Sequence, residues 1–144
     1  MSDTRPMDPR PDAAPTARAA PTAAPPQPLA GLRVVEFTHM VMGPTCGMVL
    51  ADLGAEVIKV EPPGGEGTRT LLGAGAGFFP MFNRNKLSIE LDLHHADGAA
   101  VARKLAAGAD VVVENFKPGT LAKYGLDYAS LSAVNPRLIY ASHK

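Results

Sequence analysis

From residue 29 onward, short apolar segments alternate with segments of helical periodicity, and Gly and Pro residues separate them. The apolar, β-branched segments predict strands over residues 32–37, 56–61, 86–93, 110–114 and 138–142. The segments between them predict helices over residues 45–53, 96–107, 119–123 and 128–134, with Gly43-Pro44 as a break before the first helix. Residues 64–77 contain six glycines and predict a long mobile loop.

The order of these elements indicates the fold class. Strands that alternate with helices form mainly parallel sheets, and three consecutive valines at residues 111–113 are typical of a strand buried on both faces. We therefore expect an α/β fold with a doubly wound, mainly parallel sheet. Ligands bind such sheets beyond the carboxyl ends of the strands, so the candidate binding loops are those after Phe37, Glu61 and Glu114.

The first 28 residues differ in composition from the rest of the chain. They hold eight of the 14 prolines and seven alanines, but no Val, Ile, Phe or Tyr. Such a segment cannot bury enough apolar surface to offset the entropy lost on ordering. We expect residues 1–28 to form a disordered Pro/Ala-rich tail and residues 29–144 to form the folded part, because a chain of 144 residues has room for one core.

Charge and cysteine content disfavour several classes of function. The 14 basic and 14 acidic residues give a net charge of zero, whereas nucleic-acid-binding domains carry a basic excess. The single Cys46 allows no intramolecular disulfide, and the four histidines are not spaced as metal ligands with it. No apolar run reaches the roughly 18 residues of a membrane helix, and the N-terminal region lacks the apolar core of a secretory signal. A cytoplasmic protein without metal, membrane or nucleic-acid partners is expected.

The loop after the first strand, residues 38–45, is bulky and apolar up to Gly43. It lacks the G-x-G-x-x-G spacing that lets a dinucleotide pyrophosphate approach the backbone, which disfavours a nicotinamide site. Its backbone can support an adenine or a pantetheine arm, or the loop can simply pack on the core. His39 and Cys46 have no catalytic partner in the sequence, so a structural role is favoured for both. Glu61 ends the second strand where dinucleotide folds hold a ribose, a weak match without the glycines.

The segment after the fourth strand, residues 113–119, holds the strongest local arrangement of polar and aromatic groups. Asn115 can donate and accept hydrogen bonds, Phe116 offers a face for stacking, and Lys117 carries a compact charge suited to phosphate. The Pro-Gly pair that follows makes a rigid turn. The segment predicts a ligand-binding loop, with ordinary turn chemistry as the alternative.

Six blocks of sequence occur in a fixed order: LAGLRVVEF at residues 29–37, GP at 43–44, LADLGAEVIKVE at 50–61, NRNKLSIEL at 83–91, VENFKPG at 113–119 and NPRLIY at 135–140. Together they resemble class III CoA-transferases, the family of the formyl-CoA and carnitine CoA-transferases. The resemblance covers residues 29–144 and implies the N-terminal part of a Rossmann-like large domain, with an incomplete sheet. It also implies an interlocked homodimer for the full-length protein.

The resemblance implies transfer of coenzyme A from an acyl-CoA to a free carboxylic acid, with coenzyme A as substrate and no prosthetic group. In this family a nucleophilic aspartate forms a mixed anhydride and then an enzyme thioester. That aspartate is expected beyond residue 144, because no aspartate of this sequence matches its motif. We therefore assign no catalytic residue and expect the isolated chain to be inactive. The alternative is a stand-alone CoA- or nucleotide-binding module, which an uncovered final strand disfavours.

Coenzyme A contacts carry over from the family to particular positions of this chain. The matching positions are Val41 and Met42 by backbone, Leu91 through His94, Asn115, Phe116, Lys117, and the cation positions Lys123 and Lys144. Pro62 and His94 replace an arginine and a lysine that are common in relatives. Phosphate recognition is expected to be weaker as a result, or to fall on Arg69, Arg84 or Lys86.

Overall fold

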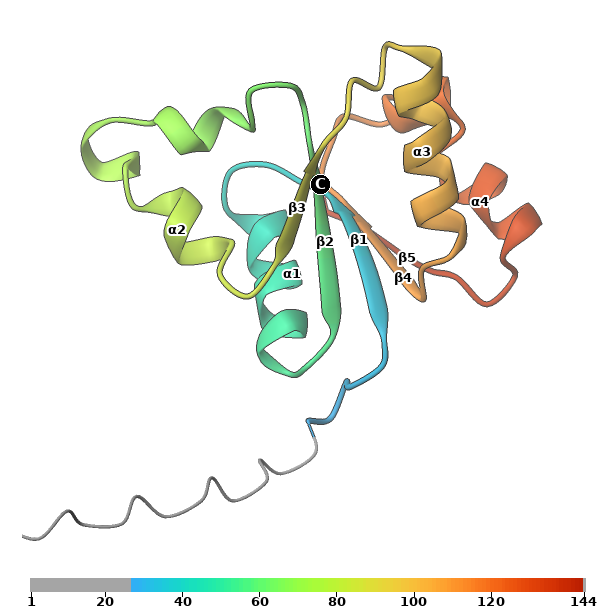
Figure 1. Ribbon diagram of the computed structural model, residues 1–144, viewed down its shortest axis with the longest axis horizontal. Coiled ribbons are helices and arrows are strands. Elements are labelled where there is room, and N and C mark those ends of the chain that lie inside the picture. Colours follow the sequence, from blue (N-terminus) through green and yellow to red (C-terminus); the bar gives the residue numbers. More distant parts are fainter. Residues whose placement is uncertain (1–26, 144) are drawn as a thin grey trace, which may run out of the picture.

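The computed structural model describes residues 27–143 of the chain (Figure 1). The tail predicted for residues 1–28 lies outside these residues except for Gln27 and Pro28, and Lys144 also lies outside them. Within residues 27–143, no helix is both long enough and apolar enough to cross a membrane.

The centre of the fold is a sheet of five strands in which every neighbouring pair is parallel. The strands are β1 (Arg33–Phe37), β2 (Glu56–Glu61), β3 (Leu87–Glu90), β4 (Val111–Glu114) and β5 (Ile139–Ser142). Their order is β3-β2-β1-β4-β5, so the chain winds outward from β1 in both directions. This confirms the doubly wound parallel sheet, and its order is that of the Rossmann arrangement.

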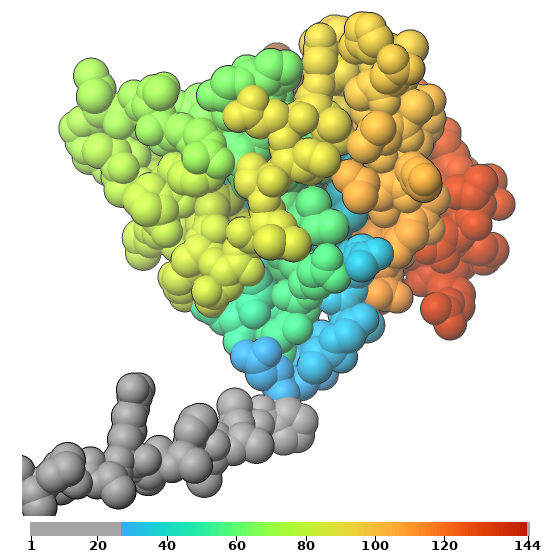
Figure 2. Space-filling view, viewed as in Figure 1, coloured from blue at the N-terminus to red at the C-terminus, as the bar shows by residue number. Residues whose placement is uncertain are grey.

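Helices cover both faces of the sheet (Figure 1). On one face lie α1 (Met42–Asp52) and α2 (Phe78–Phe82), and on the other lie α3 (Ala96–Ala107) and α4 (Tyr128–Val134). Side chains alternate between faces along each strand, so Val34 packs under α1 with Ala51, while Val35 packs under α3 with Ala102. In the space-filling view, the segment with α2 forms one side of the folded body, and α3 with α4 forms the opposite side (Figure 2).

Most predicted elements are confirmed, and three have the predicted bounds: β2, α3 and α4. The predicted break at Gly43-Pro44 is wrong, because α1 begins at Met42 and includes both residues. The first turn of a helix tolerates proline, since its N–H groups have no partner within the helix. The third strand is shorter than predicted and ends at Glu90.

The glycine-rich segment after β2 has more structure than its composition predicts. Residues 64–77 contain two short 3₁₀ helices, η1 (Gly67–Thr70) and η2 (Gly73–Gly75), and lead directly into α2. Arg69 holds this segment to β2 through two hydrogen bonds of 2.7 Å to the Glu61 carboxylate, and its guanidinium lies 3.8 Å from the centre of the Phe79 ring. Contacts with side chains outside the segment, those of Glu61 and Phe79, therefore help to order residues 64–77, whose sequence has no helix or strand pattern.

Candidate functional site

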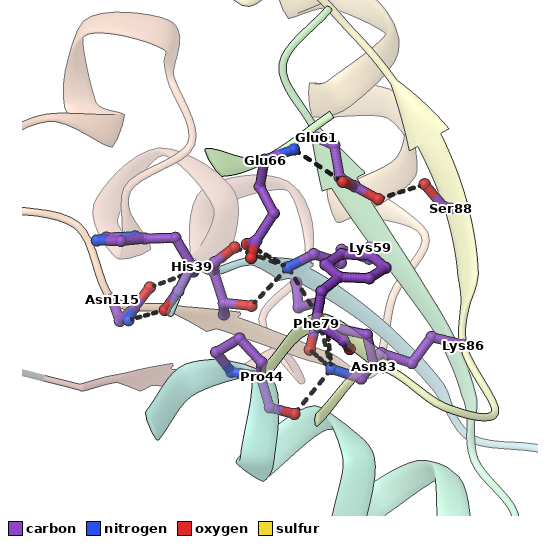
Figure 3. Close-up of polar contacts among 12 residues, drawn as sticks. His39, Pro44, Lys59, Glu61, Glu66, Phe79, Asn83, Lys86, Ser88 and Asn115 are labelled. Carbon is purple, nitrogen blue, oxygen red and sulfur yellow. Dashed lines mark hydrogen bonds and ion pairs between the residues drawn. The ribbon is translucent and has the colours of Figure 1, made fainter. Parts of the chain in front are cut away.

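The candidate site lies beyond the carboxyl ends of β1 and β4, where the direction of winding reverses. The loop from β1 to α1 and the loop after β4 meet at this point, although their contacting residues are 76 positions apart. The Asn115 Oδ1 accepts a hydrogen bond of 2.9 Å from the His39 N–H, and the Asn115 Nδ2 donates one of 2.9 Å to the His39 carbonyl (Figure 3). The strand order, rather than any local motif, brings these residues together.

A cavity of about 350 Å³ opens beside this contact. Its lining residues come from the start of α1, the loop after β4 and the end of β5: Met42, Asn115, Phe116, Lys117, Pro118 and His143. The His39 ring lies 5.2 Å from the Phe116 ring, centre to centre. Lys117 is exposed, so its ammonium group is accessible to an anion at the rim.

A second cavity, of about 300 Å³, shares Phe116 with the first as a lining residue. Its walls are mainly apolar and include Phe37, Val60, Leu91, Leu121 and Tyr124. His94 lies at its edge, with its ring 5.8 Å from that of Tyr124. The backbone and ring N–H groups of His94 bond to Asp92 and lower the pKa of that carboxyl. The site thus combines a mainly apolar cavity with a second cavity that has an exposed cation, Lys117, among its lining residues.

The structure groups most of the predicted binding residues. Met42, Asn115, Phe116 and Lys117 line the first cavity, while Leu91, His94 and Phe116 line the second. Val41 precedes α1, where its carbonyl accepts hydrogen bonds from Thr45, and it lines neither cavity. Lys123 is exposed in η3 (Leu121–Tyr124) and also lines neither. Lys144 lies outside the described residues.

The three alternative cations all have partners within the protein. Arg69 pairs with Glu61 at 2.7 Å, Arg84 pairs with Asp52 at 2.5 Å, and the buried Lys86 pairs with Glu36 at 2.8 Å. These contacts disfavour the expectation that phosphate recognition falls on Arg69, Arg84 or Lys86. Within residues 27–143, Lys117 and Lys123 form no ion pair, which leaves both available to an anion.

A cluster of buried charges lies beneath the site and was missed from the sequence (Figure 3). Glu36 and Lys59 are direct partners across β1 and β2, and both are at most 1% exposed. The Lys59 ammonium lies 3.5 Å from the Glu36 carboxylate and 3.0 Å from that of Glu66, and it donates a hydrogen bond of 2.8 Å to the Thr38 carbonyl. The sequence did contain a signal for this cluster. Glu36 in β1 and Lys59 in β2 each occupy a position where the alternation of the strand predicts an apolar residue, and the two positions lie on the same face of the sheet.

Lys86, which directly precedes β3, completes this cluster. Its ammonium donates to the Glu36 carboxylate, to the Pro44 carbonyl at 2.7 Å and to the Asn83 side chain at 3.1 Å. Burial lowers the pKa of Lys86, and the Glu36 carboxylate opposes that shift. Lys86 thus joins β1, the first turn of α1 and the end of α2, a structural role that leaves no access for a ligand phosphate.

Two residues considered from the sequence, Glu61 and Cys46, have surroundings that favour a structural role over a binding or catalytic one. The buried Glu61 carboxylate accepts hydrogen bonds from Arg69, from Ser88 at 2.6 Å and from the Glu66 N–H at 2.9 Å, which disfavours a contact with ribose. Burial of the Cys46 thiol raises its pKa, and the nearby Glu36 adds to this effect. A protonated thiol is a poor nucleophile, in keeping with a structural Cys46. Among the described residues, no three His, Cys, Asp or Glu side chains are grouped as metal ligands.

Comparisons with known proteins identify the family of the chain. The model of CoA-transferase family III matches residues 29–144. The succinate–glutarate CoA-transferase of Agrobacterium fabrum is 48% identical over 126 residues, which cover 80% of this chain and 32% of that enzyme. The acetyl-CoA:oxalate CoA-transferase of Acetobacter aceti is 44% identical over 124 residues, which cover 83% of this chain and 32% of that enzyme.

Solved structures also match this chain over most of its length. The crystal structure of Rv3272 from Mycobacterium tuberculosis in its orthorhombic form matches with a TM-score of 0.78 and 49% identity, over 83% of this chain and 33% of that one. A CAIB/BAIF family protein from Brucella suis matches with a TM-score of 0.76 and 50% identity, over 82% of this chain and 33% of that one. The chain spans about a third of the length of these relatives. The family resemblance read from the sequence is confirmed, and the chain belongs to CoA-transferase family III.

Proposed function

We propose that this chain forms the coenzyme A site of an enzyme that transfers coenzyme A from an acyl-CoA to a free carboxylic acid. The observation that carries the proposal is the pair of cavities that share Phe116, with apolar walls and the exposed Lys117 at the rim. Coenzyme A suits these features, because its adenine ring has a flat aromatic face, its pantetheine arm contains aliphatic segments, and its phosphates are anionic. The family of the chain supports this ligand above others of similar shape.

The two cavities bind different parts of coenzyme A. The apolar cavity beside Leu91 and Tyr124 takes an apolar part of coenzyme A, and the Phe116 ring offers a stacking face to it. Lys117 attracts the phosphates, and the exposed Lys123 adds positive charge, although it lines neither cavity. Several curated relatives are named for acids such as succinate, glutarate and oxalate. A small carboxylic acid is accordingly the proposed acceptor.

The covalent steps are proposed to occur on an aspartate outside these 144 residues, as a mixed anhydride and then a thioester. Among the described residues, three aspartates have other partners: Asp52 binds Arg84 and Asn85, Asp110 accepts the Arg33 N–H, and Asp127 caps α4. Asp92 lines the apolar cavity, but its carboxylate accepts the His94 N–H at 2.9 Å. The interlocked homodimer and the cytoplasmic location belong to the same proposal.

Calorimetric titration of coenzyme A into the 144-residue chain tests the binding site. Lys117→Ala should weaken binding about fivefold through loss of a charge-assisted contact, and Phe116→Ala about tenfold through loss of stacking and apolar area. Lys104→Ala is the matched control, because this exposed lysine in the last turn of α3 lines neither cavity. Absence of binding, or equal affinity of the Phe116 and Lys104 variants, would contradict the proposed site.

A transfer assay tests where the reaction occurs. The 144-residue chain, mixed with an acyl-CoA and a carboxylate, should bind the thioester without forming a new one. A new acyl-CoA product that requires the chain would show that the nucleophile lies within these residues. Binding without transfer by a longer protein that contains this chain would instead favour a binding module without catalysis.

A further inference from the structure

Both polar atoms of the Asn115 side chain form hydrogen bonds with one residue, His39, in the loop between β1 and α1. Its Oδ1 accepts from the His39 N–H at 2.9 Å, and its Nδ2 donates to the His39 carbonyl at 2.9 Å. The family resemblance places this side chain among the coenzyme A contacts. In the structure, the side-chain amide closes a ring of hydrogen bonds with the His39 backbone (Figure 3).

The loop that Asn115 holds has an unfavourable backbone conformation. Met40 follows His39 directly and has a φ of +64°, in the left-handed region that non-glycine residues seldom adopt. His39 and Met40 are exposed and belong to neither β1 nor α1, so helix and strand hydrogen bonds do not hold them. Such a conformation persists where surrounding contacts determine it. The two Asn115 hydrogen bonds supply contacts of this kind.

Contacts from the other side of the loop leave it little freedom. The buried Lys59 of β2 donates a hydrogen bond of 2.8 Å to the Thr38 carbonyl, next to His39. A side chain at Gly43 would place its Cβ 2.7 Å from Thr38 Cγ2 and 3.0 Å from Asn115 Cγ, so α1 can approach both residues only because position 43 is glycine. The loop is thus held by β2, by the segment after β4 and by the first turn of α1.

We propose that Asn115 is a positioning residue, which fixes the β1–α1 loop against Phe116 and Lys117 through the His39 backbone. This inference rests on the proposed coenzyme A site. The loop places the His39 ring 5.2 Å from the Phe116 ring and leads into Met42, which shares a cavity with Lys117. Release of the loop would therefore displace two walls of the site, although the Asn115 amide itself need not touch the ligand.

The test combines amide hydrogen exchange of His39 in the ligand-free chain, measured by NMR, with the affinity for coenzyme A. In Asn115→Ala, the His39 amide should exchange at least about tenfold faster, and coenzyme A should bind about five- to tenfold more weakly. Adding Met40→Asn should recover part of both losses, because asparagine adopts positive φ more readily than methionine does. A direct contact between Asn115 and the ligand predicts no recovery from that second change.

Asn135→Ala is the matched control for loss of a side-chain amide. Asn135 also donates to backbone carbonyls, those of Ala107 and Ala109, but it directly follows α4 and precedes β5, whereas the site lies beyond the carboxyl ends of the strands. Its loss should lower stability and leave both the His39 exchange rate and the affinity for coenzyme A unchanged. Asn115→Asp is a second variant in case the alanine variant does not fold. It keeps the acceptor for the His39 N–H and loses the donor, so an intermediate exchange rate is expected.

The outcomes separate this inference from the proposed function. Weaker binding with an unchanged His39 exchange rate would mean that Asn115 contacts the ligand directly, and would overturn the inference. Faster exchange with unchanged affinity would overturn it as well, because the loop position would then be irrelevant to binding. If the unsubstituted chain does not bind coenzyme A, the proposed function fails, and the exchange rate alone decides whether Asn115 holds the loop.

Discussion

At the scale of single residues, one glycine makes room for the buried charges beneath the site. A Cβ at position 47 would lie 1.8 Å from the Glu36 Oε2 and 3.2 Å from the Lys86 Nζ. Gly47 lies within α1, where glycine is less favourable than alanine by roughly 1 kcal/mol. The glycine therefore costs helix stability and permits a carboxylate to lie against the helix backbone.

Gly47→Ala should destabilise the protein by at least about 2 kcal/mol, despite the higher helix propensity of alanine, because the added methyl group displaces Glu36 from its cations. The midpoint of urea unfolding measures the effect. Gly67→Ala is the control, since nothing lies within 4 Å of a Cβ at that position, and it should change stability by less than about 0.5 kcal/mol. An alanine variant at position 47 as stable as the parent would show that Glu36 moves without cost.

At the scale of elements, a few charged side chains hold the long connection between β2 and β3. Arg69 joins its first part to β2, Lys86 joins its last part to β1 and α1, and Arg84 joins it to Asp52 at the end of α1. Leu72 and Met81 of this segment are exposed, whereas Phe78, Phe79 and Phe82 are half-buried. Ion pairs thus attach the connection to the rest of the fold at both ends.

Lys86→Met should lower the free energy of unfolding by about 3 kcal/mol, because it leaves the buried Glu36 with Lys59 as its remaining cation. It should also speed proteolysis of residues 62–86, whose last part then keeps only the contacts of Arg84 and Asn85 with Asp52. Urea unfolding and limited proteolysis measure the two effects. The control is Lys104→Met, an exposed lysine of α3, for which neither quantity should change. Loss of stability without faster cleavage would locate the effect in β1 and α1 alone.

At the scale of the whole molecule, one buried carboxylate makes stability depend on pH. Burial alone would raise the pKa of Glu61, but hydrogen bonds from Arg69, Ser88 and the Glu66 backbone outweigh it and lower the pKa from 4.5 to about 2. A carboxyl group with a lower pKa in the folded state stabilises the protein at pH values above its unfolded pKa. This contribution is complete above about pH 4.5 and is lost as the pH falls towards 2.

Arg69→Met should therefore destabilise the protein by up to about 3 kcal/mol near pH 6, and the difference from the parent should shrink as the pH falls from 4.5 towards 2. Chemical unfolding at a series of pH values measures this slope. Arg103→Met is the control, because Arg103 donates to the uncharged Tyr124 carbonyl, and its effect should not vary over this range. A difference for Arg69→Met that stays constant down to pH 2 would contradict the assigned role of the Glu61 pair.

The sequence by itself determined the succession of strands and helices, the parallel sheet and the loops that form the site. These features can be predicted from hydrophobic periodicity, turn residues and short blocks of sequence, because each of these signals involves residues that are close together in the chain. Asn115, Phe116 and Lys117 were identified in the same way, because they directly follow a buried strand.

Only the tertiary structure decided what the polar side chains do. Asn115 meets His39 across 76 residues, and Lys86 meets Glu36 across 50, because the strand order places their elements side by side. The sequence does not show which acidic residue a basic residue will pair with. Lys86 and Arg69 were therefore possible phosphate ligands from the sequence, whereas in the structure they pair with the carboxylates of Glu36 and Glu61. Hydrophobic pattern is a property of a segment, whereas an ion pair is a property of two segments and of the register between them.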